Sequence, residues 1–237
     1  GRLTQADGRL KYYTQGTSVV GDSLAERRWI AQALPYNQNW TAQVEVNLPS
    51  NLALVNESLA SLGLLITNQD DAEENTYIEL VTGRDPNGQL WRRFAASIDG
   101  STGWQDPDWS DDTTSTRGVL RLRWMTSEKK LYYEYDADGS ANGYSWTLLR
   151  SQTLAGAGGS TNWGMNDSSS FAVGIFGETE DITITTADNM WLDDFKIFAL
   201  PTITTQPTTQ TALSSATVTL SAVANGGSLT YQWQKDG

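Results

Sequence analysis

Apolar and polar side chains alternate along much of the first 200 residues, with the two-residue period of β-strands that bury one face. In residues 40–48 every even position is apolar and every odd position is polar. In residues 120–124, Leu and Trp side chains alternate with Arg121 and Arg123 in the same way. Similar patterns predict further strands at 61–67, 76–82, 89–97, 130–136, 145–150, 171–177, 182–185 and 190–198.

Turn residues separate several of these segments. Asp85-Pro-Asn-Gly88, Asp99-Gly100, Asp138-Gly139 and Asn142-Gly143 are typical of tight turns between antiparallel strands. A helical pattern competes at 51–62, where Leu52, Leu54, Val55, Leu59 and Leu62 could form one apolar stripe. Many short strands joined by Gly- and Asp-containing turns predict an all-β fold, a two-sheet antiparallel β-sandwich of the jelly-roll type.

Charge divides the chain of 237 residues into two parts. Its formal charge is −12, from 16 basic and 28 acidic residues, and residues 201–237 contribute only Lys235 and Asp236. The change falls at Ala199-Leu-Pro201, where a strand pattern meets a segment rich in Thr and Pro. Proline interrupts strand pairing. We therefore predict one domain over residues 1–199, followed by a linker and a second unit over 200–237.

Composition excludes several kinds of chemistry. The chain has no Cys and no His, which removes disulfides, zinc fingers, thiol nucleophiles and Ser-His-Asp triads. The excess of acidic residues argues against a nucleic-acid partner, because phosphate binding needs clustered Lys and Arg. No apolar run approaches the ~18 residues of a transmembrane helix. Carboxylates, Lys, Tyr and hydroxyl groups remain for any catalysis.

The tail resembles the start of a bacterial immunoglobulin-like domain. The resemblance lies in residues 201–207, in Ala216–Val223 and above all in Leu229–Gly237, which ends Tyr-Gln-Trp-Gln-Lys-Asp-Gly. It implies that Trp233 is the tryptophan of the third strand and that about three strands of the domain are present. Since such domains need about seven strands, the resemblance implies further domains C-terminal to this chain.

The first domain is similar to the concanavalin A-like lectin and glucanase jelly rolls, including laminin G-like modules. The matching residues are Gly143–Leu148, Phe171–Gly177 and the last strand Met190–Ile197. The resemblance implies a jelly-roll fold and glycan binding. It also implies a secreted or cell-surface bacterial protein.

Paired carboxylates are the catalytic option that composition leaves open, since glycoside hydrolysis uses two of them. The glucanase branch carries Glu-x-Asp-x-Glu on one strand, and the nearest match is Glu134-Tyr-Asp136-Ala-Asp138. It ends in Asp and runs directly into the turn at Asp138-Gly139. We expect a solvated strand end here and no catalytic site.

Ten tryptophans raise the question of sugar binding, because a pyranose ring can stack on an indole. The strand patterns place Trp40, Trp124 and Trp146 in the core and leave Trp91 and Trp191 undecided. Residues 99–112 contain Trp104 and Trp109 with five Asp and no strand pattern. We predict a carbohydrate-binding site at Trp104, Asp106, Asp108 and Trp109, the alternative being a loop whose tryptophans cover the sandwich. Trp163 lies in a second loop without a strand pattern.

A structural Ca²⁺ is the cofactor that the jelly-roll resemblance implies. Many of these domains hold calcium between the chain start and an aspartate of the last strand, which here is Asp193. Alternation places Asp193 on one face with Trp191, Phe195 and Ile197, pointing inward, where a carboxylate needs a partner. Calcium or a hydrogen bond could be that partner. The acidic segment 106–112 is a second candidate for calcium.

These observations favour a secreted, non-catalytic module that binds glycans or adheres to cell surfaces. One alternative is a glycoside hydrolase or polysaccharide lyase that acts through carboxylates or Tyr. Another is a structural spacer, which the immunoglobulin-like tail makes plausible.

Overall fold

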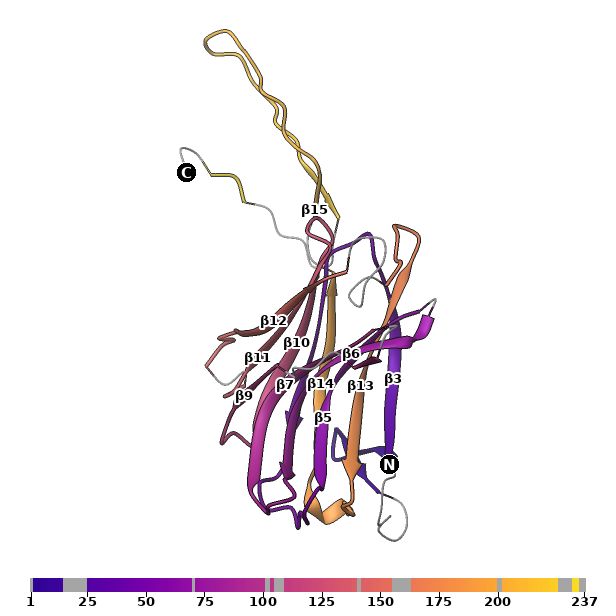
Figure 1. The fold of residues 1–237 in the computed structure, drawn as a ribbon. Coiled ribbons are helices and arrows are strands. Elements are labelled where there is room, and N and C mark those ends of the chain that lie inside the picture. Colours follow the sequence, from indigo (N-terminus) through magenta and orange to yellow (C-terminus); the bar gives the residue numbers. More distant parts are fainter. Residues whose placement is uncertain are drawn as a thin grey trace.

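The structure is a computed structural model that describes residues 2–14, 25–69, 71–100, 103–104, 109–139, 142–154, 163–199, 202–225 and 232–234. Its strands form two antiparallel sheets that pack face to face (Figure 1). The prediction of an all-β sandwich is confirmed. Among the described residues the only regular helical structure is η1 (Thr186–Asp188), a single 3-10 turn. The described part of the chain contains no helix that is long and apolar enough to cross a membrane.

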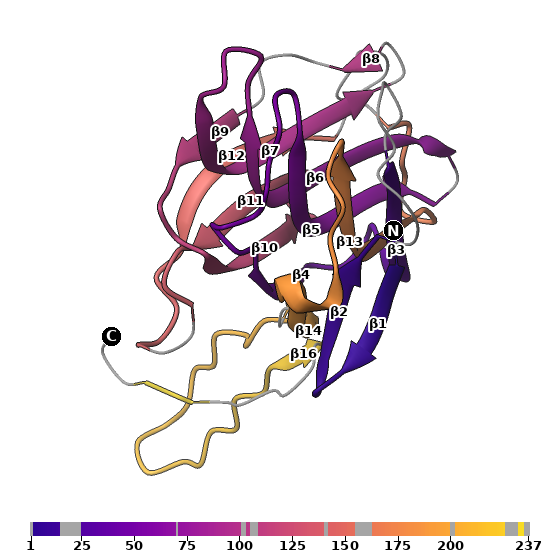
Figure 2. The ribbon, with the colours of Figure 1, turned by 90° about the horizontal axis from the view of Figure 1, so that it is seen from below.

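Sheet A has the order β1 (Arg2–Ala6), β2 (Arg9–Tyr13), β14 (Trp191–Ala199), β4 (Trp40–Asn47), β10 (Arg117–Met125), β11 (Lys130–Asp136) and β12 (Thr147–Thr153). Sheet B has the order β3 (Ala25–Pro35), β13 (Ser170–Glu180), β5 (Leu59–Asn68), β6 (Asp71–Arg84), β7 (Leu90–Gly100) and β8 (Gly103–Trp104). Strand β9 (Trp109–Asp112) also pairs with β7. The N-terminal hairpin of β1 and β2 therefore lies at one edge of sheet A, where β2 pairs with the last strand of the sandwich, β14, as Figure 2 shows.

The core lies between the sheets and contains the apolar residues of the alternating patterns. Every even position of β4 is fully or almost fully buried, as are Leu120, Leu122 and Trp124 of β10. An aromatic cluster occupies one end, where Phe171 contacts Trp40 at 5.3 Å, Trp124 at 5.0 Å and Trp163 at 6.2 Å between ring centroids. Burial of such rings is a large favourable contribution, ~4–6 kcal/mol gross for each.

Three expectations for local structure are wrong. Residues 51–62 form no helix: residues 51–57 are loop and turn, and β5 begins at Leu59, where pairing with both β6 and β13 favours a strand. Residues 182–185 form no strand and lead into η1. Trp163 contributes to the core, with 3% exposure, so it is not a surface residue for sugar.

The tail forms a separate two-stranded hairpin of β15 (Thr202–Thr205) and β16 (Val223–Asn225), which extends away from the sandwich (Figure 1). Leu213 is 88% exposed and Trp233 is 60% exposed. Both side chains are therefore largely exposed to solvent. The immunoglobulin-like assignment stays a prediction.

Candidate functional site

Polar and charged residues form rows across the outer face of sheet A. Strand pairing aligns Lys196 of β14 with Gln43 of β4, Gln43 with Arg121 of β10, and Arg121 with Glu134 of β11. The neighbouring row contains Thr41 and Arg123, which alternate with core residues in the same strands. These side chains point away from the core because their neighbours along each strand point into it.

Glu134 lies between two arginines on this face. Arg121 Nε donates to one carboxylate oxygen at 2.7 Å, and Arg123 Nη2 donates to the other at 2.6 Å. The Glu134 side chain is only 7% exposed, so this is a largely buried charge with two counter-charges. Burial lowers the pKa of the Arg121 guanidinium, whereas the hydrogen bond to Glu134 raises the pKa of Arg123.

Asp136, the second carboxylate of the Glu-x-Asp-x-Asp segment, organises the turn that follows β11. It is 1% exposed and accepts hydrogen bonds from the backbone N–H of Ser145 at 2.6 Å and of Asp138 at 3.2 Å. The predicted turn is present, but the expected solvation is wrong for Glu134 and Asp136. Both carboxylates make hydrogen bonds that hold the local structure. Neither is therefore placed to donate a proton to a substrate as a general acid.

The chain after this turn crosses back over the outer face and places two aromatic rings there, Tyr144 and Trp146, here called the aromatic pair. The ring of Trp146 lies 3.6 Å from the Arg121 guanidinium carbon and stacks on Tyr144 with centroids 5.0 Å apart and planes 17° apart. Gln43 Nε2 donates to the Tyr144 hydroxyl at 2.9 Å. Tyr144 is 42% exposed, so its ring is both held in place and accessible.

The assignment of Trp146 to the core is wrong, and sequence reasoning gave Tyr144 no role in binding. The alternation of apolar and polar residues could not predict where these two side chains lie, because β12 begins only at Thr147. The segment before it is folded over the outer face of sheet A by the hydrogen bond from the Ser145 N–H to Asp136. The available signal was local: Gly143, which has a φ of 86°, is followed by two aromatics spaced two residues apart.

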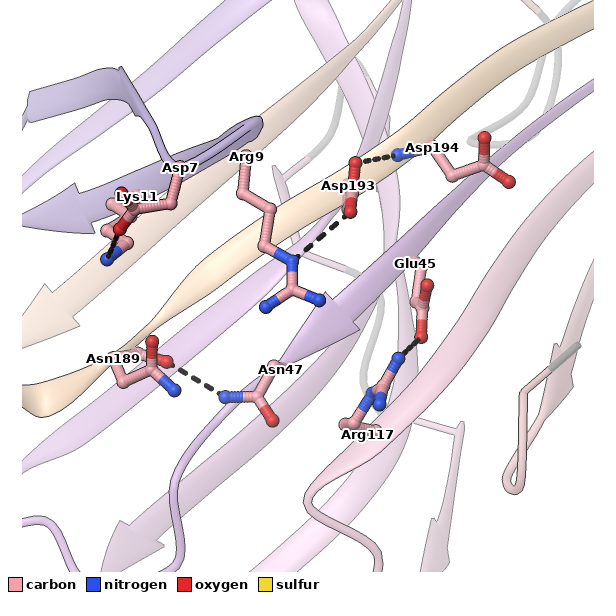
Figure 3. Close-up of polar contacts among 9 residues, drawn as sticks. All are labelled: Asp7, Arg9, Lys11, Glu45, Asn47, Arg117, Asn189, Asp193 and Asp194. Atoms are coloured by element: carbon pink, nitrogen blue, oxygen red, sulfur yellow. Dashed lines mark hydrogen bonds and ion pairs between the residues drawn. The ribbon is translucent and has the colours of Figure 1, made fainter. Parts of the chain in front are cut away.

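Asp193 lies at the other end of the outer face, next to the N-terminal hairpin (Figure 3). Its Oδ2 accepts from Arg9 Nε at 3.2 Å, and its Oδ1 accepts from the backbone N–H of Asp194 at 2.8 Å. The Asp193 side chain is 34% exposed. The inward orientation predicted for Asp193 is therefore wrong.

A β-bulge explains the difference. The pairing of β14 with β4 shifts between Asp193 and Lys196, and Asp194 has a φ of 53°. Leu192 on one side of the bulge, and Phe195 and Ile197 on the other, pack against the core. The extra residue changes which face each position occupies, so Asp193 does not share a face with Phe195 and Ile197.

The surroundings of Asp193 do not fit calcium. Calcium takes about 6–8 oxygen ligands, usually with several carboxylates. Asp193 accepts from a guanidinium and a backbone N–H, both of which are donors, and among the residues that the structure describes no three acidic side chains gather in a possible metal site. Arg9 is thus the partner of this carboxylate, with which it forms an ion pair.

Trp191 lies beside this ion pair, stacked against two arginines. Arg9 approaches its ring centroid at 3.9 Å and Arg117 at 5.3 Å, and Arg117 in turn pairs with Glu45 (Figure 3 shows both ion pairs). Trp191 is 2% exposed. Because the ring is almost fully buried beneath two guanidinium groups, this tryptophan is not accessible for stacking on a sugar.

A hollow of about 280 Å³ opens where β14 separates from β2. Its lining combines the core residues Val44, Ile175 and Leu192 with polar residues, among them Arg9 and Asp193. Tyr144 and Trp146 are not among the residues that line it. The hollow is therefore distinct from the surface around the aromatic pair.

The predicted carbohydrate site at residues 99–112 lies on the other sheet. Trp104 in β8 and Trp109 in β9 pair with Asp99 and Ala96 of β7, while Asp106 and Asp108 lie outside the described residues. At the end of this segment, Asp111 accepts from the Tyr135 hydroxyl at 2.8 Å and Asp112 from Arg93 at 3.2 Å. The site at Trp104 and Trp109 stays a prediction, separate from the aromatic pair.

Comparison with known proteins supports the fold. No protein-family model and no curated protein sequence matches the chain. Among solved structures it is similar to the CBM2 module of the evolved Dit of Lactobacillus casei BL23 phage J-1, with 12% identity, a TM-score of 0.50, and coverage of 81% of this chain and 75% of that chain. It is also similar to an immunostimulatory antigen and pseudo β-1,3-glucanase of Mycobacterium tuberculosis, with 15% identity, a TM-score of 0.41, and coverage of 73% and 68%. At 12% identity the likeness to the phage module establishes a shared fold.

Proposed function

We propose that this chain is a non-catalytic glycan-binding module that binds through the aromatic pair on the outer face of sheet A. The observation that carries the proposal is the exposed Tyr144 ring, fixed by Gln43 through its hydroxyl and by Trp146 through stacking. A rigid, partly exposed aromatic surface binds with little loss of conformational entropy. The Tyr144 hydroxyl accepts from Gln43 and keeps its own O–H, which is placed to donate to a sugar hydroxyl group.

The fold supports the proposal without deciding it. The carbohydrate-binding CBM2 module of the phage protein shares this β-sandwich. A glycan-binding role also agrees with a secreted or cell-surface location and with adhesion, which we include in the proposal. The tail would then begin an immunoglobulin-like unit of a larger modular protein.

The catalytic alternative has less support on this face. Glycoside hydrolysis needs one carboxylic acid to protonate the leaving group and a second carboxylate to act as base or nucleophile. Glu134 is paired with Arg121 and Arg123, and Asp136 holds the turn after β11. A spacer, for its part, has no need of an aromatic ring that is exposed and held in place.

Binding to a panel of polysaccharides and to a glycan array tests the proposal. We expect Tyr144→Ala to weaken binding at least ~10-fold, ~1.4 kcal/mol, because the stacking surface is removed. Tyr144→Phe keeps the ring and should keep most of the affinity.

Trp233→Ala is the matched control, since it removes an aromatic that is 60% exposed but lies in the tail. It should bind like the parent chain. A parent chain that binds no glycan, or a Tyr144→Ala variant that binds as well as the parent, would overturn the proposal.

A further inference from the structure

Five ion pairs hold positive side chains on the outer face of sheet A, where Lys130 lies over the Tyr132 ring instead. The ion pairs are Arg9–Asp193 at 3.2 Å, Arg121–Glu134 at 2.7 Å, Arg123–Glu134 at 2.6 Å, Lys196–Asp194 at 2.5 Å, and Arg117–Glu45. In each pair a guanidinium or ammonium group already donates to an acid. A negatively charged ligand would have to displace that acid before it could make the same contact.

Lys196 is the cation that matters most for the aromatic pair. It pairs across the strands with Gln43, whose side chain donates to the Tyr144 hydroxyl. The hydrogen bond from Lys196 to Asp194 raises the pKa of the lysine, so the ammonium stays charged and directed to Asp194. Lys196 and the arginines on Glu134 therefore already have a counter-charge, with which a carboxylate or sulfate beside Tyr144 would have to compete.

The net charge of the whole chain also disfavours the binding of a negatively charged ligand. With a formal charge of −12, the protein repels a polyanion at long range unless a local cationic patch compensates. The ion pairs on the outer face prevent such a patch from forming around the aromatic pair.

We infer that the aromatic pair selects a neutral glycan, built of uncharged hexoses or pentoses, and discriminates against polyuronates and sulfated polysaccharides. This inference rests on the proposed function. The contacts available are ring stacking and hydrogen bonds, neither of which depends strongly on ionic strength.

The test compares soluble neutral polysaccharides (β-glucan, xylan and mannan) with alginate and polygalacturonate, at low ionic strength and at ~1 M NaCl, where charges are screened beyond ~3 Å. We expect binding to a neutral polysaccharide that changes less than about twofold with salt, and no measurable binding to the polyuronates. Tighter binding to a polyuronate, weakened by salt, would overturn this inference but leave the proposed function standing. Absence of binding to both classes would overturn the proposed function and this inference with it.

Two matched variants test the cause of the selectivity. Asp194→Asn removes the partner of Lys196 near Tyr144, whereas Asp7→Asn removes the partner of Lys11 in the N-terminal hairpin. Both aspartates have positive φ, 53° and 54°, which asparagine tolerates well. Both substitutions change the net charge equally.

We expect Asp194→Asn to gain about threefold in affinity for polygalacturonate at low salt, the size of one exposed charge interaction, and to lose the gain at high salt. Asp7→Asn should show no gain. If the two variants behave alike, the ion pair of Lys196 does not set the selectivity, and the inference is wrong.

Discussion

At the scale of single residues, Glu134 is the charge on which the outer face of sheet A depends. It receives hydrogen bonds from both Arg121 and Arg123 and is 7% exposed. Trp146 lies against Arg121, so the position of the aromatic pair depends on the same carboxylate.

Glu134→Gln should destabilise the fold by about 3 kcal/mol, because two partly buried guanidinium groups lose their counter-charge. The free energy of unfolding, measured by urea denaturation, checks this. Glu128→Gln is the control: Glu128 is an exposed acid that accepts from the Tyr132 hydroxyl, and its substitution should cost about 0.5 kcal/mol or less. Equal losses in the two variants would show that Glu134 has no special structural role.

Tyr135 should make stability fall at alkaline pH. Burial, with the hydrogen bond to Asp111 as a second cause, raises the pKa of this phenol to about 12. Since this value lies above the ~10 of an unfolded tyrosine, the stability that the protonated phenol contributes is complete below pH ~10 and is lost as the pH rises towards ~12.

In Tyr135→Phe, urea midpoints should therefore fall less steeply between pH ~10 and ~12 than in the parent chain. The stacking of the ring on Phe94, at 4.3 Å between centroids, is kept in this variant. Some slope should remain, because burial also raises the pKa of Tyr133. Identical slopes in the two proteins would contradict the assignment.

At the scale of elements, the bulge in β14 decides the chemistry of the sandwich edge. It leaves β14 paired with β2 over only Trp191 and Leu192 and brings Asp193 to Arg9 of the first hairpin. An ion pair therefore joins the start of the domain to its last strand, at the place where the sequence resemblance implies calcium.

Chelation should consequently leave the melting temperature unchanged, and Asp193→Asn should lower it by only ~2–4 °C, because an ion pair that is one-third exposed contributes ~1 kcal/mol or less. Differential scanning calorimetry with and without chelator measures both effects. A fall of ~5 °C or more on chelation, absent in Asp193→Asn, would establish the calcium site after all.

At the scale of the whole molecule, periodicity in the sequence is enough to predict the sandwich. The alternation in β4 and β10 identifies the core side of sheet A, since Val44, Leu120 and Leu122 are all fully buried. Every second residue of a half-buried strand faces the core, so alternation over several residues is a reliable signal of a strand and of its buried face.

The site is less predictable, because it depends on departures from that regularity. The bulge at Asp194 reverses the expected face of Asp193, and the hydrogen bond from Ser145 to Asp136 carries Tyr144 and Trp146 over the outer face. Each departure depends on one or two hydrogen bonds between loop and strand. Such bonds leave no periodic trace in the sequence.

The two candidate glycan sites lie on opposite sheets: the proposed one at the aromatic pair on sheet A, and the predicted one around Trp104 and Trp109 on sheet B. The indole N–H signals of the ten tryptophans in a ¹H–¹⁵N spectrum distinguish between them. Trp→Phe variants at 104, 109 and 146 assign the three signals that matter.

This spectrum, recorded during titration with a neutral oligosaccharide, tests the central claim most directly. We predict that the signal of Trp146 shifts in proportion to saturation while those of Trp104 and Trp109 stay in place, and that Tyr144→Ala abolishes the shift. Shifts at Trp104 and Trp109 with none at Trp146 would contradict the assignment of glycan binding to the outer face of sheet A.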